Sequence, residues 1–489
     1  KMETEKIDYY KNQLEKYGAE LKSLERRKSS FAWLRLGSIA AIILAFYLLW
    51  HAGVLYVAAV SVVLLFVFIR MVYADLRNHE KIRFTKVLIG LYVKEINSLK
   101  GEFPFETGDK FLDKEHPYTS DLDIFGEGSL FQFLNRTSSD AGSSMLSLFL
   151  KSKADLEEIM QRQKSVAELA KEPEWQKKIH TLGTINKLTS SSENRLKEWI
   201  NQDNHFIQFK PWSWLRYLLP LVSVTITILY FTDSISLIAF LSVLFVMSII
   251  AWQIDKIVAP VHRQLDEIAS QLGYISLSLE MIEQRRFSSE MLKQMHDGLF
   301  NGNSCASGEI KKIKKILDRL DLRYNFLLSW PLNVLLLWNL QQILDLEKWK
   351  TAQKPFVTHW IEILAKTEAL CSLANFSFNN PTYTFPQITE DYFSLSGKDV
   401  GHPLIPTIKR VNNPVELPTK GQLLLITGSN MAGKSTYLRS IGVNCVLAFC
   451  GAPVCASHFK VSLVDLISSM RIADNLMEST STFYAELKK

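Results

Sequence analysis

Eight consecutive residues have the types and spacing that hold a phosphate group. Gly428-Ser429-Asn430-Met431-Ala432-Gly433-Lys434-Ser435, followed by Thr436, fits the pattern G-x-x-x-x-G-K-S. Glycines at these positions let successive backbone N–H groups curl around phosphate oxygens, and a following helix directs its positive end at them. We expect Lys434 to reach the β- and γ-phosphates and the Ser435 hydroxyl to ligate Mg²⁺. The sequence therefore predicts a nucleotide-binding site.

The elements that must position this loop are a strand before it and a helix after it. The apolar run Leu423–Ile426, within a strand-like segment 422–427, precedes the loop, and a helical stretch follows it. From about Asn379 the sequence consists of short apolar runs and turns, whereas the chain before it is helical in pattern. We therefore predict a helical body followed by an α/β domain. Cys450, Cys455 and His458 lie close together, but their spacing fits no zinc pattern.

Length and composition limit the class of protein. At 489 residues the chain is several times a domain of roughly 150, so we expect at least two folded units. Hydrophobic residues at 47% and charged residues at 22% argue against disorder and against a mostly intramembrane chain. A net charge of +6 does not distinguish nucleic acid from an anionic membrane as partner. Five scattered cysteines without a Cys-x-x-Cys favour a reducing compartment.

Two apolar blocks stand out from this average. Residues 36–69 include no Asp, Glu, Lys or Arg, and one helix of that run would be about 51 Å long, well beyond the roughly 30 Å hydrocarbon core. His51-Ala52-Gly53 breaks this run, and Thr232-Asp233-Ser234 interrupts the second block, residues 217–254. We expect two transmembrane hairpins, with buried core helices as the alternative. The shorter apolar stretch Phe326–Leu340 contains Pro331, and we interpret it as a buried helix of a soluble region.

Lys and Arg lie on one side of each expected hairpin. The flanking cations are Arg26, Arg27, Lys28, Arg35, Arg70, Arg77, Lys81, Arg83, Lys210, Arg216, Lys256 and Arg263. The two connecting turns hold none. The positive-inside rule therefore predicts a multi-pass protein of the cell membrane with four helices. It places the N-terminus and the phosphate loop in the cytoplasm, and His51 and Asp233 on the other side.

Three helical patterns lie outside these blocks. Apolar residues at alternating spacings of three and four run from Ile7 to Leu24, and again from Val258 to Ile282. The first pattern allows either dimerisation or packing within the chain, and the second predicts a helix of at least 25 residues leaving the membrane. A basic run, Lys311–Arg319, is interpreted as a solvated or lipid-facing surface, with contact to nucleic acid as the alternative.

The residues from Gly421 to Lys489 resemble the ATPase domain of the MutS family of mismatch-repair proteins. The Asn-Met dipeptide of the loop is unusual among phosphate loops, and Arg471–Asn475 and Ser481-Thr482-Phe483 are similar to the stretch before the family's second nucleotide motif. Residues 128–169 look like the start of the family's helical core, and residues 368–374 look like its end. The resemblance covers roughly residues 118–210 and 256–489.

This resemblance implies ATP and Mg²⁺ as ligands and a homodimer formed through the ATPase domains. It implies that Ser481 reaches the partner's nucleotide in trans, although a serine there also suits the cap of a helix starting at Thr482. Arg410 stands where the family has an aromatic residue that stacks on adenine, just ahead of its Asn-Pro, and a guanidinium can stack on the base.

The departures from the family separate the possible functions. The first 117 residues, which take the place of the family's mismatch-reading domain, contain no Phe-x-Glu motif. The second hairpin occupies the place of the family's DNA clamp. The acidic pair that holds Mg²⁺ and the attacking water does not occur, so we expect a chain truncated before that motif. The main hypothesis is a membrane-anchored MutS-like ATPase whose nucleotide state switches a dimer. The alternatives are DNA surveillance at the membrane and a membrane tether with an inactive ATPase; a cassette transporter is disfavoured because no Leu-Ser-Gly-Gly-Gln motif occurs.

The fold class predicted is therefore mixed, with an α-helical MutS-type core, two transmembrane hairpins and an incomplete α/β phosphate-loop domain. The expected units are an N-terminal helix (1–30), hairpin 1 (31–75), a helix and linker (76–117), the first part of the core (118–210), hairpin 2 (211–255), the second part of the core (256–390) and the ATPase domain (391–489).

Overall fold

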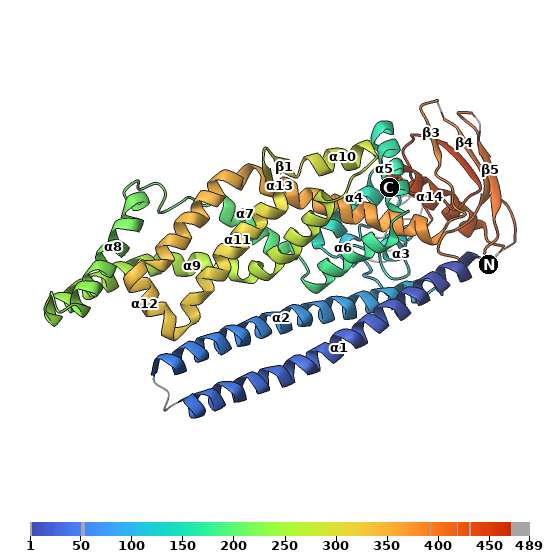
Figure 1. Cartoon of the computed structure of the whole chain (residues 1–489). Helices are drawn as coiled ribbons and strands as arrows, with labels where there is room; N and C mark the ends of the chain where they lie inside the picture. The colour runs from blue at the N-terminus through green and yellow to red at the C-terminus, as the bar shows by residue number, and fades with distance from the viewer. Residues whose placement is uncertain (1, 50–53, 392, 418, 430–431, 471–489) are drawn as a thin grey trace, which may run out of the picture.

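Long helices make up most of the molecule, and a small sheet lies at one end (Figure 1). The computed structural model describes residues 2–49, 54–391, 393–417, 419–429 and 432–470. The α-helices are α1 (Met2–Leu49), α2 (Val54–Leu99), α3 (Leu130–Leu134), α4 (Asp140–Lys151), α5 (Leu156–Leu169), α6 (Pro173–Ile185), α7 (Ser190–Asn201), α8 (Trp212–Phe231), α9 (Leu237–Glu283), α10 (Glu290–Asp297), α11 (Ala306–Leu320), α12 (Phe326–Leu336), α13 (Trp338–Asn379) and α14 (Lys434–Cys450). Two 3₁₀ turns are η2 (Asp109–Phe111) and η3 (Asp321–Tyr324).

The core is formed where α9, α11 and α13 pack together and against the shorter helices α4 to α7. The apolar pattern predicted from Val258 to Ile282 is confirmed. It lies on the second half of α9, and its members are buried or partly buried in this core. Burying one stripe of a helix this long anchors residues 258–282 to the core, because each buried aliphatic side chain contributes about 1.5–3 kcal/mol.

The N-terminal pattern packs within the chain. Tyr10 and Tyr17 of α1 are buried against Leu88 and Tyr92 of α2, and the rings of Tyr17 and Tyr92 stack with centroids 5.8 Å apart. The helices α1 and α2 run side by side along one flank of the molecule (Figure 1). The heptad-like spacing in the first 24 residues is therefore used to join α1 to α2.

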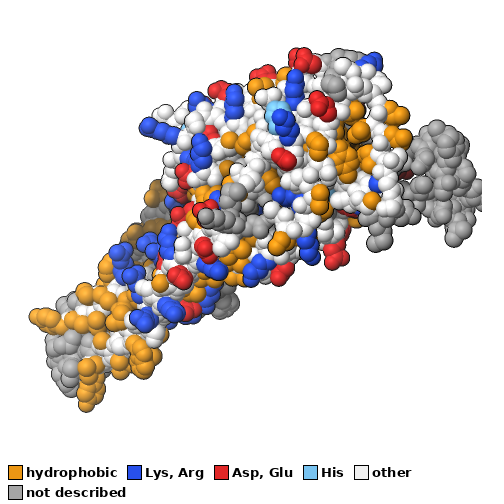
Figure 2. Space-filling view, turned by 90° about the vertical axis from the view of Figure 1, so that its right-hand side faces the viewer, with side chains coloured by type: hydrophobic (Ala, Val, Ile, Leu, Met, Phe, Trp, Pro, Cys, Tyr) orange, Lys and Arg blue, Asp and Glu red, His pale blue; other side chains and the backbone are white. Residues whose placement is uncertain are grey.

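The apolar blocks lie at the end of the molecule away from the sheet. The C-terminal end of α1, the N-terminal end of α2 and the pair α8–α9 all lie at this end of the molecule (Figure 1). Two helical segments, Trp212–Phe231 and Leu237–Asp266, are long and apolar enough to cross a membrane, and only 11% of an apolar 18-residue stretch in each is buried in the protein. Figure 2 shows hydrophobic side chains gathered at one narrow end, next to a group of Lys and Arg side chains.

The stretch Phe326–Leu340 differs from the single buried helix predicted for it. The helix α12 ends at Leu336, Leu337 adopts a left-handed conformation (φ 46°, ψ 48°), and α13 begins at Trp338. Leu337 and Leu340 are buried, but the Trp330 side chain is 60% exposed. The prediction was wrong because it rested on length and composition, which do not reveal the hydrogen bonds at the break from Ser223 of α8 and to the side chain of Asn333.

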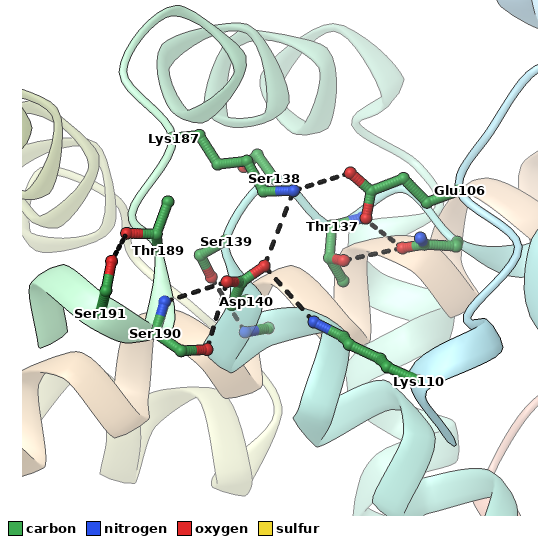
Figure 3. Close-up of polar contacts among 12 residues, drawn as sticks. Glu106, Lys110, Thr137, Ser138, Ser139, Asp140, Lys187, Thr189, Ser190 and Ser191 are labelled. Atoms are coloured by element: carbon green, nitrogen blue, oxygen red, sulfur yellow. Dashed lines mark hydrogen bonds and ion pairs between the residues drawn. The ribbon is translucent and has the colours of Figure 1, made fainter. Parts of the chain in front are cut away.

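The segment between α2 and α3 is attached to the core by an ionic cluster around Asp140, the first residue of α4 (Figure 3). The Asp140 carboxylate accepts a hydrogen bond from the Ser190 backbone N–H at 2.9 Å and lies 3.4 Å from the Lys110 ammonium. Lys187 bridges Asp140, at 3.6 Å, and Glu106, at 2.7 Å. These contacts hold the loop residues 106–110 against the starts of α4 and α7.

The sheet near the end of the chain has the strand order β3-β6-β4-β5. Only β3 and β6 are parallel; β4 is antiparallel to both β5 and β6. The strands are β1 (Phe300–Asn301) and β2 (Ser304–Cys305), which form a separate hairpin, and β3 (Gln387–Thr389), β4 (Leu395–Val400), β5 (Asn413–Leu417) and β6 (His458–Ser462). The described residues thus give a mostly helical protein with small sheets, and α14 packs beside β4.

Candidate nucleotide-binding site

The phosphate-loop residues lead directly into α14. Gly433 caps this helix with φ 86° and ψ 13°, a left-handed conformation that glycine adopts without a steric penalty. Lys434, Ser435 and Thr436 form the first turn, where backbone N–H groups have no partner within the helix. The helix therefore presents its positive end and these three side chains at one place, as an anion site requires.

The Lys434 ammonium points back over the loop. Its Nζ donates hydrogen bonds to the carbonyl oxygens of Gly428 at 2.6 Å and Ser429 at 2.8 Å. These bonds hold the ammonium on the side of the loop where the helix N-terminus also lies. Ser435 and Thr436 are exposed, so their hydroxyls are open to a ligand. The arrangement fits a phosphate with an accompanying divalent cation.

The strand predicted before the loop, residues 422–427, is not formed. No strand is assigned there, and the side chains of Leu423 and Leu425 are 89% and 78% exposed. A strand needs a neighbouring strand for its backbone N–H and C=O groups, and none of the described residues supplies one at this position. The prediction rested on the apolar run alone.

The second half of α14 is buried and fixes the site to the helical core. It packs on α4 and α5, and at Gly442 a Cβ atom would come within 2.8 Å of the Leu122 side chain. Arg439 pairs with Asp123 at 3.3 Å. The loop is therefore carried by a helix whose far end is held rigidly by the core.

Asn444 is a structural residue that the sequence reasoning did not identify. It is fully buried in α14; its Nδ2 donates to the Gly401 carbonyl at 2.9 Å, and its Oδ1 accepts from the Cys455 N–H at 2.7 Å. An amide within the apolar run 443–449 was the available signal, because a buried polar side chain needs partners. Asn444 thereby ties the phosphate-loop helix to two neighbouring segments.

Arg410 lies in the segment that borders α14. Its guanidinium donates to the Tyr383 hydroxyl at 2.8 Å and to Asn412 Oδ1 at 3.2 Å. Tyr437, in the first turns of α14, donates to the Pro414 carbonyl at 2.6 Å, which places residues near 414 beside the phosphate loop. The guanidinium is thus oriented by Tyr383, a partner that the sequence did not reveal.

The cysteine and histidine group near the end of α14 gives no metal site in the described structure. Cys450 and Cys455 are buried, and burial raises the pKa of the Cys450 thiol to about 11. A cysteine that binds a metal must be a thiolate, which this environment disfavours.

Three predicted site residues, Asn430, Met431 and Ser481, lie outside the described residues, so their predicted roles stay predictions.

The C-terminal end of the chain, which carries the phosphate loop, is similar to a known protein family. The profile of MutS domain V matches residues 424–489, which begin just before the phosphate loop. The C-terminal region of this chain belongs to the MutS family. The matched range includes Lys434 and Ser435, which the geometry places at the first turn of α14.

Individual proteins of the MutS family are also similar to the C-terminal region of this chain. The DNA mismatch repair protein MutS of Acetivibrio thermocellus is 36% identical over 132 residues, which are 26% of this chain and 15% of that protein. The protein of the same name from Methanosarcina acetivorans is 37% identical over 131 residues, 26% of this chain and 14% of that protein. The DNA mismatch repair protein MSH3 of Vanderwaltozyma polyspora is 34% identical over 131 residues, 26% and 13% of the two chains. The similarity therefore covers about a seventh of each relative.

Proposed function

We propose that this chain is part of a membrane-anchored MutS-like ATPase in which nucleotide binding controls the association of two copies. The observation that carries the proposal is the phosphate loop Gly428–Ser435 on the N-terminus of α14, within a match to MutS domain V. The loop lies at the end of the molecule opposite the apolar ends of α8 and α9 (Figure 1).

ATP and Mg²⁺ fit the residues present. Lys434 would hold the β- and γ-phosphates, Ser435 would ligate the cation, and the N–H groups at the start of α14 would bind phosphate oxygens. Bound Mg²⁺ neutralises developing phosphate charge, which is what phosphoryl transfer needs. Arg410 is assigned to the adenine, because its guanidinium is held beside α14 by Tyr383 and Asn412.

Membrane anchoring is supported by composition and by position. The two helices α8 and α9 have the length and hydropathy of transmembrane spans, and their apolar side chains are mostly exposed. Together with the apolar halves of α1 and α2 they form the expected four spans, with Lys and Arg kept to the cytoplasmic flank. The partners proposed are membrane lipid and a second copy that places its Ser481 against the nucleotide.

DNA is a second candidate partner, favoured by the names of the relatives. The basic face of α11 is the available surface, but three of its lysines are already paired with carboxylates: Lys311 with Glu280, Lys312 with Glu309 and Lys314 with Asp318. Pairing of this kind weakens the attraction to phosphates. Binding of duplex DNA that falls steeply with salt would support this candidate, and no binding at low salt would exclude it.

The direct test of the proposed site is Lys434→Ala in the full-length protein. Loss of a charge-assisted contact to phosphate costs about 2–5 kcal/mol, so affinity for a labelled ATP analogue should fall at least about 30-fold. Lys409→Ala, which removes an exposed lysine outside the loop, is the matched control and should bind normally. Equal affinity of the Lys434→Ala and wild-type proteins would show that this loop is not the nucleotide site. Tight binding without turnover would favour the tether with an inactive ATPase.

A further inference from the structure

The chain contains a third apolar element near the expected membrane, too short to cross it. Between Arg323 and Asp345 there is no Asp, Glu, Lys or Arg. This stretch forms α12, the left-handed break at Leu337 and the first turns of α13. The 11 residues of α12 span about 16 Å, roughly half of a hydrocarbon core of about 30 Å.

Contacts with α8 show how deep this element reaches. The helix α12 packs against both α8 and α9. Near its C-terminal end, the Leu335 carbonyl oxygen accepts a hydrogen bond from the Ser223 hydroxyl, which is buried. Ser223 lies eleven residues beyond Trp212, the first residue of α8, and is therefore about 16 Å along that helix. If α8 crosses a bilayer with Arg216 at the boundary of the hydrocarbon, Ser223 and the end of α12 lie seven residues, or about 10 Å, inside it.

Two ion pairs lie at the two ends of the uncharged stretch. Arg216 of α8 pairs with Asp345 of α13 at 2.9 Å, and Arg323 pairs with Asp255 of α9 at 3.1 Å. Each pair joins a candidate span to one flank of the uncharged stretch. Charges at a common level next to apolar helices are typical of the boundary between hydrocarbon and headgroups.

The break in the backbone is built for an environment without water. Leu337 is buried, and the Asn333 side chain sits beside it: its Oδ1 accepts from the Asn339 N–H at 3.0 Å, and its Nδ2 donates to the Ser329 carbonyl at 3.0 Å. Irregular backbone at membrane depth is tolerated only where its polar groups are satisfied inside the protein. Here Asn333 supplies a partner for the Asn339 N–H, and Ser223 supplies one for the Leu335 carbonyl.

Two apolar side chains on different sides of α12 are left uncovered. The side chains of Leu328 and Trp330 are 46% and 60% exposed, and no described part of the chain lies over them. The helices α8 and α9, against which α12 packs, also carry mostly exposed apolar side chains. Exposed apolar side chains beside lipid-facing helices are expected to contact the same lipid.

We propose that α12 is a re-entrant membrane helix. It enters the cytoplasmic leaflet beside α8 and α9, packs Leu328 and Trp330 against phospholipid acyl chains, turns at Leu337 and leaves as α13. This inference rests on the proposed membrane anchoring through α8 and α9. It makes α13, which runs on to Asn379 just before the sheet, a direct connection between the bilayer and the nucleotide-binding end.

The test measures lipid contact at single positions in the full chain. Variants with one cysteine, in a background without the five native cysteines, are labelled with a small fluorophore and placed in phosphatidylcholine vesicles with or without brominated acyl chains. The test position is Leu328→Cys, and Trp330→Cys is a second reading if the first fails to fold. Ile238→Cys in α9 reports on the proposed span. Met160→Cys in α5, with the same 46% exposure as Leu328, is the matched control on the core.

Brominated chains should quench positions 238 and 328 about twofold, because both would touch hydrocarbon, and should leave position 160 unchanged. Quenching at 238 without quenching at 328 or 330 would overturn the re-entrant helix and leave the membrane anchoring standing. Absence of quenching at 238 as well would overturn both. Equal quenching at 160 and 328 would mean non-specific contact of the core with lipid and would also overturn the inference.

Discussion

His402 is a residue whose environment decides its charge. It lies beside the segment that borders α14, and burial, with the nearby guanidiniums of Arg439 and Arg410, lowers its pKa to about 4 despite the opposing effect of Asp123. Its Nδ1 accepts a hydrogen bond from the Leu404 N–H at 3.3 Å. His402 is therefore neutral in the folded protein near pH 7.

A pH dependence follows from this depressed pKa. The unfolded chain takes up the proton near pH 6.5 and the folded protein only near pH 4, so the stabilisation is complete above 6.5 and is lost as pH falls toward 4. At pH 5 the loss should be about 2 kcal/mol. His402→Asn keeps an acceptor in place and cannot be protonated. Its unfolding midpoint should fall less between pH 7 and pH 5 than that of the wild-type protein; an equal fall would contradict the assignment.

Lys434 and Arg410 show how far single residues could be predicted. The position of Lys434 at the start of a helix follows from a local motif, since spacing alone fixes which backbone N–H groups converge. The contact of Arg410 with Tyr383 joins residues 27 positions apart and depends on how β5 and α14 pack, which no local pattern encodes. Asn444 could have been suspected as a buried polar residue, but its two partners could not.

At the scale of elements, α2 is joined to the core through a buried carboxylate. Glu95 is completely buried; burial opposes its ionisation, but Arg136, at 2.6 Å, and Lys177 offset this and hold its pKa well below the usual range. Asn379, the last residue of α13, also donates to Glu95 at 3.2 Å and accepts from the Tyr10 hydroxyl at 2.7 Å. One carboxylate thus connects α2 and α6 with the end of α13, and through Asn379 with α1.

Glu95→Gln should therefore destabilise the protein strongly. It leaves two buried cations without their counter-charge, which typically costs about 3–5 kcal/mol. Glu106→Gln removes an exposed carboxylate that pairs with Lys187 and should change stability by less than about 1 kcal/mol. Thermal unfolding of both variants of the full chain, in the same detergent, compares them. Coincident midpoints would mean that the Glu95 cluster does not hold α2 to the core.

Element positions differ in how well the sequence predicts them. The apolar stripe of α9 could be predicted because its period repeats over many turns and one face must be buried. The end of α12 at Leu336 could not, since a hydrogen bond from Ser223 and the side chain of Asn333 determine it. The apolar run at 422–427 suggested a strand, but a strand forms only when a neighbour pairs with it.

At the scale of the whole molecule, the proposed functions lie at opposite ends. The apolar helix ends gather at one end, and the sheet and α14 lie at the other (Figure 1). The 42-residue helix α13 runs between them and would be about 63 Å long if straight. In the proposed function, a nucleotide-dependent change at α14 would reach the apolar end through the packed helices α4, α5 and α13.

In the proposed function, ATP bound by the loop of α14 brings two membrane-anchored copies together. The most direct test is energy transfer between donor- and acceptor-labelled copies of the full-length protein in lipid vesicles, each labelled at Lys398→Cys in β4 in the cysteine-free background. We expect ATP with Mg²⁺ to raise the transfer in the otherwise wild-type protein and to leave it unchanged when Lys434→Ala is present in both copies. An ATP response of the same size with and without Lys434→Ala, or no response although ATP is bound, would contradict the proposed function.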